Sequence, residues 1–117
     1  MKKILVADDE MAIRLLYSEE LKEEGYEVYT AANGREALDI VSKVPLDLVI
    51  LDIKMPEMDG IEALRQIKEM QPELPVLLST AYGEYRQDFA TWASDEYLVK
   101  SSDLEDLKNA VKRHLKE

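Results

Sequence analysis

Short unbroken runs of apolar residues, each ending on a polar residue, constrain the fold of this chain most strongly. Strands buried on both faces carry such runs, whereas half-exposed strands alternate apolar and polar residues. Strands of the first kind belong to parallel sheets that helices cover on both sides. The four runs are Ile4–Ala7 before Asp8, Leu48–Leu51 before Asp52, Val76–Leu78 before Ser79, and Tyr97–Val99 before Lys100.

Amphipathic patterns fill the gaps between these runs. Their apolar residues recur at the period of a helix with one buried face. Gly25 and Pro45 mark the ends of the first two helices, and Asp59 with Glu62 predicts a capping box at the start of the third. The predicted buried faces are Ile13, Leu16, Tyr17 and Leu21; Ala37, Leu38 and Val41; Ile61, Leu64 and Ile67; and Leu104, Leu107, Val111 and Leu115.

Two weaker elements complete the pattern. Val28–Thr30 predicts a short strand, and Tyr85, Phe89 and Trp92 predict a helix over residues 84–92. Strand and helix then alternate along the chain, and right-handed crossovers turn that order into an open parallel sheet with helices on both faces. The predicted fold is a doubly wound α/β three-layer sandwich, with residues 1–117 as one domain.

Polar residues of complementary chemistry follow four of the expected strands. In a parallel sheet, the residues just past the strand ends gather along one edge. A single Asp at such a position is as often a solvated loop residue as a functional one, but five suitable residues at four strand ends argue against coincidence. The five are Asp8, Asp9, Asp52, Thr80 and Lys100.

Three carboxylates at one edge require a cation. At a separation of about 5 Å, each pair repels by roughly 3 kcal/mol at an effective dielectric constant of about 20. Oxygen ligands that leave room for water suit Mg²⁺, with Mn²⁺ as an acceptable substitute, and the lack of cysteine disfavours Zn²⁺. Thr80 and Lys100 can bind phosphoryl oxygens, so Asp52 can act as a nucleophile toward phosphorus.

The chain is strongly acidic, with 25 acidic against 15 basic residues and a formal net charge of −10. This charge argues against direct binding to nucleic acid or to an anionic membrane, because both need a clustered positive surface. The start MKKILVADDE is too short in apolar residues for a signal-peptide core or a membrane span. We therefore expect a cytoplasmic protein.

Together these motifs resemble the receiver domain of two-component response regulators. The segments KILVADDE, LVILDIKMPEMDG, VLLSTAYGE and DEYLVK occur in that family's order and spacing, over essentially the whole chain. The resemblance implies a flavodoxin-like (βα)5 fold with five parallel strands in the order 2-1-3-4-5. It also implies that a sensor histidine kinase or a histidine phosphotransfer protein donates the phosphoryl group, and that an output domain or protein responds.

The same resemblance assigns roles at the predicted edge. Asp52 is the phosphoacceptor, with Lys100 and Thr80 beside the phosphoryl group. Thr80 and Tyr97 form a switch that changes the surface around the last two predicted helices. A homodimer through that surface is compatible with the family. The implied metal ligands are Asp8, Asp9, Asp52 and the main-chain carbonyl of Lys54.

The chain departs from the family pattern after Lys100. Receivers usually have a proline there, joined by a cis peptide bond, whereas this chain has Ser101. A cis bond costs about 3 kcal/mol before serine, against less than about 1 kcal/mol before proline. We therefore predict a trans bond between Lys100 and Ser101, and a loop that differs from that of the family.

Two alternative functions stay open at this point. One is a Mg²⁺-dependent phosphohydrolase that uses an aspartyl phosphate, but such enzymes usually carry a second Asp two residues after the first, and Lys54 stands there. The other is a receiver-like interaction module that is not phosphorylated, which Ser101 makes more credible. If the chain is a receiver, which is the leading hypothesis, we expect self-phosphorylation and self-dephosphorylation only. It is then not expected to be an enzyme that acts on a metabolite.

Overall fold

Strands and helices alternate along the chain, which the computed structural model describes at residues 1–81, 94–100 and 104–116. None of the helices in these ranges is long and apolar enough to span a membrane. The helix predicted over residues 84–92 and the bond between Lys100 and Ser101 lie outside the described residues. The elements are β1 (Lys3–Ala7), α1 (Met11–Glu23), β2 (Glu27–Ala31), α2 (Gly34–Lys43), β3 (Leu48–Leu51), α3 (Gly60–Met70), β4 (Val76–Thr80), β5 (Glu96–Val99) and α4 (Glu105–Leu115).

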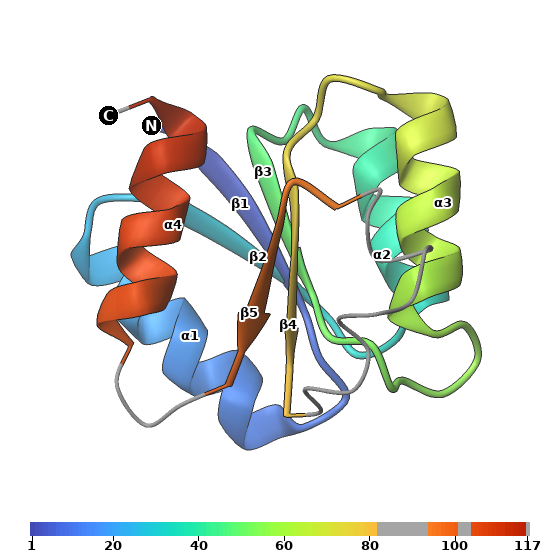
Figure 1. Cartoon of the computed structure of the whole chain (residues 1–117), viewed down its shortest axis with the longest axis horizontal. Coiled ribbons are helices and arrows are strands. Elements are labelled where there is room, and N and C mark those ends of the chain that lie inside the picture. Colours follow the sequence, from blue (N-terminus) through green and yellow to red (C-terminus); the bar gives the residue numbers. More distant parts are fainter. Residues whose placement is uncertain (82–93, 101–103, 117) are drawn as a thin grey trace.

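The five strands form one sheet in the order β2-β1-β3-β4-β5. Every neighbouring pair is parallel, and the register places Ile4 between Val28 and Leu48. Figure 1 shows α1 and α4 against one face of the sheet and α2 and α3 against the other. The predicted doubly wound three-layer sandwich and its strand order are therefore confirmed.

The central strand β3 shows why an unbroken apolar run was needed. Successive side chains in a strand point to opposite faces. Val49 and Leu51 belong to the apolar cluster on the side of α2 and α3, whereas Leu48 and Ile50 belong to the cluster on the side of α1 and α4. All four residues are at most 1% exposed, so one short strand contributes to two cores.

Local signals fix several helix ends. Gly25 follows α1 with a φ of +96°, a left-handed conformation that favours glycine and ends helices. The side chain of Asp59 accepts a hydrogen bond from the Glu62 backbone N–H at 2.9 Å and so starts α3. Asp59 thus makes its half of the predicted capping box, whereas the Glu62 carboxylate accepts hydrogen bonds from Arg65 and Gln66.

The predicted buried face of α1 is partly wrong. Tyr17 and Leu21 are buried, but Leu16 is 42% exposed. A helix turns by about 100° per residue, so Leu16 lies to one side of the stripe that contains Tyr17 and Leu21. Leu16 is instead exposed, as are Met11 and Leu15 of the same helix.

Candidate functional site

Backbone hydrogen bonds continue the sheet pattern just past the strand ends and so hold the candidate site residues. Asp52 follows β3, and its N–H donates to the carbonyl of Ala7 in β1 at 2.9 Å. Lys100 follows β5, and its N–H donates to the carbonyl of Thr80 in β4 at 2.7 Å. The carboxyl ends of these strands meet at the lower edge of the sheet in Figure 1. The positions of both side chains are therefore set by the sheet itself.

Lys100 lies between two buried carboxylates. Its Nζ atom is 2.6 Å from Asp8 Oδ2 and 3.4 Å from Asp52 Oδ1. Asp8 and Asp52 are 2% and 6% exposed, so solvent ions screen these charges little. Burial by itself would lower the pKa of Lys100, but the hydrogen bond and charges of Asp8 and Asp52 outweigh it and hold that pKa above its usual range. The ammonium group therefore stays charged at neutral pH.

Asp52 is only partly compensated by Lys100. Burial raises the pKa of the Asp52 carboxyl to about 6, and the negative charge of Asp8 acts in the same direction. The Lys100 ammonium and the Ile53 N–H, which donates to Asp52 Oδ1 at 2.9 Å, lower the pKa without cancelling that rise. The negative charge of the Asp52 carboxylate is thus only partly neutralised, and a divalent cation would neutralise the rest.

The turn after β1 gathers three acidic side chains. Asp8, Asp9 and Glu10 each offer a carboxylate oxygen, and these oxygens lie within 4.8 Å of one another. Asp8 is buried, whereas Asp9 and Glu10 are exposed. Hard oxygen donors with open sides suit Mg²⁺, which keeps several waters when it binds. Sequence reasoning does not single out Glu10, although its position directly after the two Asp residues is a usable signal.

A glycine lets the turn after β3 pass close to Asp52. The N–H of Gly60 donates to the carbonyl of Ile53 at 2.7 Å. A Cβ atom on Gly60 would lie 1.9 Å from the carbonyl oxygen of Asp52, a distance that no side chain can adopt. Only glycine therefore permits this path of the chain. Sequence reasoning reads Gly60 as part of a turn and misses this role.

The two predicted switch residues lie in neighbouring strands. Thr80 is the last residue of β4 and is fully buried. Tyr97 lies beside Leu78 in the register of β4 and β5, and it packs against the core on the side of α2 and α3. Thr80 pairs in turn with Val99, so a displacement of Thr80 would reach β5 directly.

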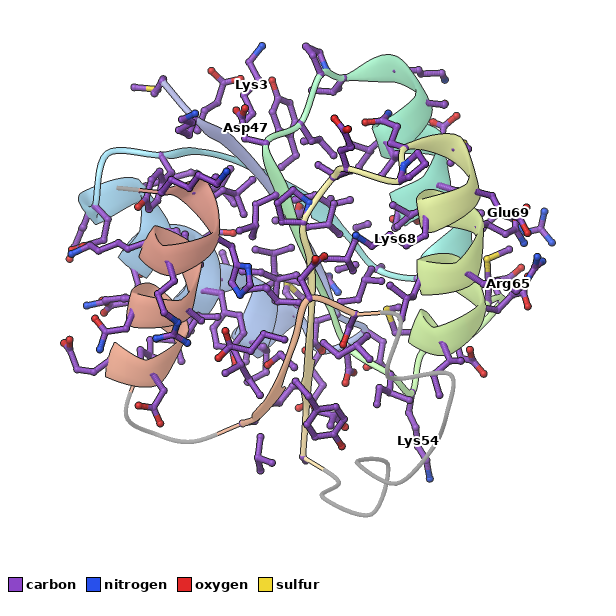
Figure 2. All side chains as sticks on the ribbon, turned by 45° about the horizontal axis from the view of Figure 1, so that its top comes forward. Lys3, Asp47, Lys54, Arg65, Lys68 and Glu69 are labelled. Carbon is purple, nitrogen blue, oxygen red and sulfur yellow. The ribbon has the colours of Figure 1, made fainter. Side chains whose placement is uncertain are left out.

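An open hollow of about 550 Å³ borders the acidic turn, and it is lined by Asp9 from that turn and by Lys54, Pro56 and Asp59 from the segment after β3. Lys54 is exposed in the turn after β3. Figure 2 shows Lys54 at the end of the molecule opposite to Lys3 and Asp47. The structure thus places Lys54 at the same end as the acidic turn.

Comparison with known proteins places this arrangement in a family. A family model described as the response regulator receiver domain matches residues 4–112 of the chain. The chain belongs to the response regulator receiver domain family. The matched range includes all five strands except Lys3 at the start of β1, together with the residues from Asp8 to Lys100.

Two similar proteins differ in length, one being about as long as this chain and the other much longer. This receiver domain is 42% identical over 116 residues to sporulation initiation phosphotransferase F of Bacillus subtilis, with 97% of this chain and 94% of the relative covered. It is 37% identical over 117 residues to the regulatory protein AtoC of Escherichia coli, with 98% of this chain but 25% of the relative covered. The chain therefore matches nearly all of the first relative and a quarter of the second.

Solved structures resemble the receiver domain closely. The response regulator TrrA of Thermotoga maritima in complex with Mg²⁺-BeF has a TM-score of 0.95 and 50% identity, with 97% of this chain and 99% of that chain covered. TrrA in complex with the histidine kinase ThkA has a TM-score of 0.93 and 50% identity, with 98% of this chain and 99% of that chain covered.

Proposed function

We propose that residues 1–117 act as a single phosphorylatable receiver domain in which Asp52 accepts a phosphoryl group from a phosphohistidine. The observation that carries this proposal is a buried Asp52 carboxylate 3.4 Å from the Lys100 ammonium, at the same strand ends as the acidic turn. The donor is a sensor histidine kinase or a histidine phosphotransfer protein. The complex of TrrA with ThkA supports a partner of this class.

The transfer step uses the Asp52 carboxylate as nucleophile. One of its oxygens forms a bond to phosphorus while the phosphorus–nitrogen bond of the donor breaks, and the electron pair of that bond stays on the donor imidazole. Lys100 Nζ already bridges Asp8 and Asp52, so it lies within reach of a phosphoryl oxygen. The Thr80 hydroxyl is proposed to donate to another oxygen.

The donor atoms at this edge fit a hard divalent cation. Asp8, Asp9, Asp52 and the main-chain carbonyl of Lys54 would hold Mg²⁺, with Mn²⁺ as an acceptable substitute. Glu10 is a further candidate, because its carboxylate belongs to the same acidic group. When bound, the cation neutralises charge on the carboxylates and the phosphoryl oxygens. The TrrA complex with Mg²⁺-BeF supports this choice of metal.

The donor protein is proposed to dock on the exposed side of α1. Met11 and Leu15, one helical turn apart, are 65% and 55% exposed, and Leu16 beside Leu15 in the sequence is 42% exposed. Exposed apolar clusters commonly mark protein interaction sites. Because α1 begins directly after the acidic turn, a partner bound there would hold its phosphohistidine close to Asp52.

Phosphorylation is proposed to act on the surface of β5 and α4. A phosphoryl group adds about one further negative charge and three acceptor oxygens at Asp52. Thr80 would move toward it, and the pairing of β4 with β5 would carry the change to Tyr97. The partner that binds this changed surface would be an output domain, a separate protein or a second copy of the chain. The cytoplasmic location stays a prediction from the sequence.

Incubation with acetyl phosphate and Mg²⁺ tests the proposed function. A stoichiometric, base-labile adduct that decays slowly supports a receiver. Continuous turnover of small phosphate esters would instead indicate a phosphohydrolase. The absence of any adduct, with Mg²⁺ bound, would indicate an interaction module that is not phosphorylated.

A further inference from the structure

Arg14 reaches back from α1 to the acidic turn. Its guanidinium NH1 group donates a hydrogen bond to the main-chain carbonyl of Asp8 at 2.6 Å. Its own backbone N–H donates to the carbonyl of Glu10 at 3.1 Å. Arg14 is half-buried, so its side chain is part of the packed structure around the turn. The same residue thus holds both ends of the segment from Asp8 to Glu10.

The remaining polar groups of Asp8 are also engaged. Its N–H donates to the carbonyl of Ala31 at 3.0 Å. Its Oδ1 atom accepts from the Glu10 N–H at 2.9 Å, and its Oδ2 atom accepts from Lys100 at 2.6 Å. The Arg14 contact completes this set at the carbonyl. Asp8 is therefore fixed in the backbone and in the side chain.

The Asp8 carbonyl also determines how the chain continues into Asp9. The peptide unit that joins Asp8 to Asp9 is planar, so the direction of that carbonyl fixes the direction in which the chain enters Asp9. Asp9 is exposed and lies at the hollow beside the turn. A guanidinium that holds the Asp8 carbonyl therefore also holds the peptide plane that leads to the Cα atom of Asp9, from which the Asp9 carboxylate extends.

The electrostatic environment of Arg14 is mixed, because the carboxylates of the acidic turn attract its guanidinium. Arg14 is the fourth residue of α1, and the positive end of a helix dipole disfavours a cation. A positive charge close to the acidic turn also repels a divalent cation. Orientation by the hydrogen bond should tighten metal binding, whereas the charge should weaken it. These two effects have opposite signs and can be separated by experiment.

We propose that Arg14 is a positioning residue that holds the acidic turn in its metal-binding geometry through the Asp8 carbonyl. This inference rests on the metal site of the proposed function. Outer partners that orient metal ligands typically change metal affinity by about 10- to 100-fold when they are removed. Arg14 would act on the metal only through its hydrogen bond to the Asp8 carbonyl and would not itself be a ligand.

The test titrates Mg²⁺ alone into the parent chain and into Arg14→Met and Arg14→Lys by calorimetry. Arg65 supplies the matched control, because its guanidinium is bound to Glu62 and Glu69 on α3 and points outward in Figure 2. We expect Arg14→Met to bind Mg²⁺ about tenfold more weakly than the parent, although it removes a repelling charge. Arg14→Lys should be at least about threefold weaker, because the lysine side chain is one bond too short to place its donor where the guanidinium NH1 lies, and it keeps the repelling charge. Arg65→Met and Arg65→Lys should match the parent.

Equal or tighter binding by Arg14→Met would overturn the proposal, because the residue would then act through its charge alone. If Arg14→Met does not fold, Arg14→Lys decides in the same way, and parent-like affinity overturns the proposal. Hydrogen exchange of the Glu10 amide in the metal-free chain gives a second readout, which should quicken in both Arg14 variants and in neither Arg65 variant. A parent chain that binds no Mg²⁺ but shows this exchange pattern would refute the proposed metal site and leave the positioning of the turn supported.

Discussion

Lys100 and Asp8 form an ion pair of 2.6 Å across 92 residues of sequence. The ammonium group thus sits beside the acidic turn, where it neutralises part of the charge that a metal ion would neutralise. Lys100 also lies 3.4 Å from Asp52, so one side chain compensates two buried carboxylates. A metal ion bound at the acidic turn would therefore compete with Lys100 for Asp8.

Replacement of Lys100 by methionine tests this competition. We expect Lys100→Met to bind Mg²⁺ about three- to tenfold more tightly, which corresponds to roughly 1 kcal/mol. The metal-free variant should lose about 3 kcal/mol of stability, because two buried carboxylates lose their partner. Calorimetry and urea unfolding measure these effects. Lys43→Met, which breaks an exposed pair with Asp39, should change neither quantity, and weaker Mg²⁺ binding by Lys100→Met would contradict the competition.

The pKa of Asp52 predicts a pH-dependent stability. Its folded-state pKa is raised to about 6 from a usual value of 3.8, so between these values the folded chain binds more protons than the unfolded chain. Stability should therefore fall as pH rises from about 4 to about 6, and the buried charge should cost roughly 2 to 3 kcal/mol at neutral pH without metal. Asp52→Asn should be more stable than the parent by about that amount at pH 7.5.

Urea unfolding without Mg²⁺ at pH 7.5 and at pH 4 measures this effect. At pH 4 the Asp52 carboxyl of the parent is largely protonated in the folded chain. The difference in the free energy of unfolding between Asp52→Asn and the parent should therefore nearly vanish at that pH. The exposed Asp39 supplies a control, because Asp39→Asn should match the parent within about 0.5 kcal/mol at both pH values. If Asp52→Asn gained the same stability at both pH values, the charge of the buried Asp52 carboxylate would not be the cause of the gain.

The exposed apolar side of α1 predicts a partner-specific defect. Leu15→Asp should slow phosphoryl transfer from a cognate phosphohistidine protein by about tenfold or more, because a charge replaces an apolar contact. It should leave labelling by acetyl phosphate unchanged, since Leu15 lies outside the acidic turn. Met70 on α3 is 46% exposed, and Met70→Asp should affect neither reaction. Equal loss with both phosphoryl donors would place the defect in the site instead of the docking surface.

Gly60 and Gly25 are both glycines at turns but predict different outcomes. A Cβ atom on Gly60 would meet the Asp52 carbonyl oxygen at 1.9 Å, so Gly60→Ala should displace Asp52 and slow labelling by acetyl phosphate by about tenfold or more. Nothing lies within 4 Å of a Cβ atom on Gly25, but its φ is +96°. Gly25→Ala should therefore lose about 1 kcal/mol of stability and label normally. Equal labelling by both variants would refute this role of Gly60.

The sheet could be predicted because its signals are local and redundant. The run Leu48–Leu51 has no polar residue, which indicates burial on both faces whatever the rest of the chain does. Gly25 indicates the end of α1 independently of tertiary contacts. Parallel connectivity then brings Asp52 and Lys100 to one edge. These steps need only the backbone path, and the sequence specifies that path well.

The contacts inside the site depend on packing and could not be predicted. Lys100 approaches Asp8 more closely than Asp52, and that preference depends on the conformation of a long side chain. The hydrogen bond from Arg14 to the Asp8 carbonyl likewise depends on the conformation of a long side chain. The exposure of Leu16 depends on how α1 is rotated against the sheet, which periodicity fixes only to within a residue.

The most direct measurement compares two aspartates that flank the same strand. Asp47 precedes β3 and accepts a hydrogen bond from the Lys3 N–H at 2.7 Å, whereas Asp52 follows β3 beside Lys100. Figure 2 places Asp47 far from the end of the sheet that carries the site. Each is replaced by asparagine, and intact mass after incubation with acetyl phosphate and Mg²⁺ is compared with the parent. We expect one phosphoryl group on the parent and on Asp47→Asn and none on Asp52→Asn; full labelling of Asp52→Asn would show that Asp52 is not the phosphoacceptor.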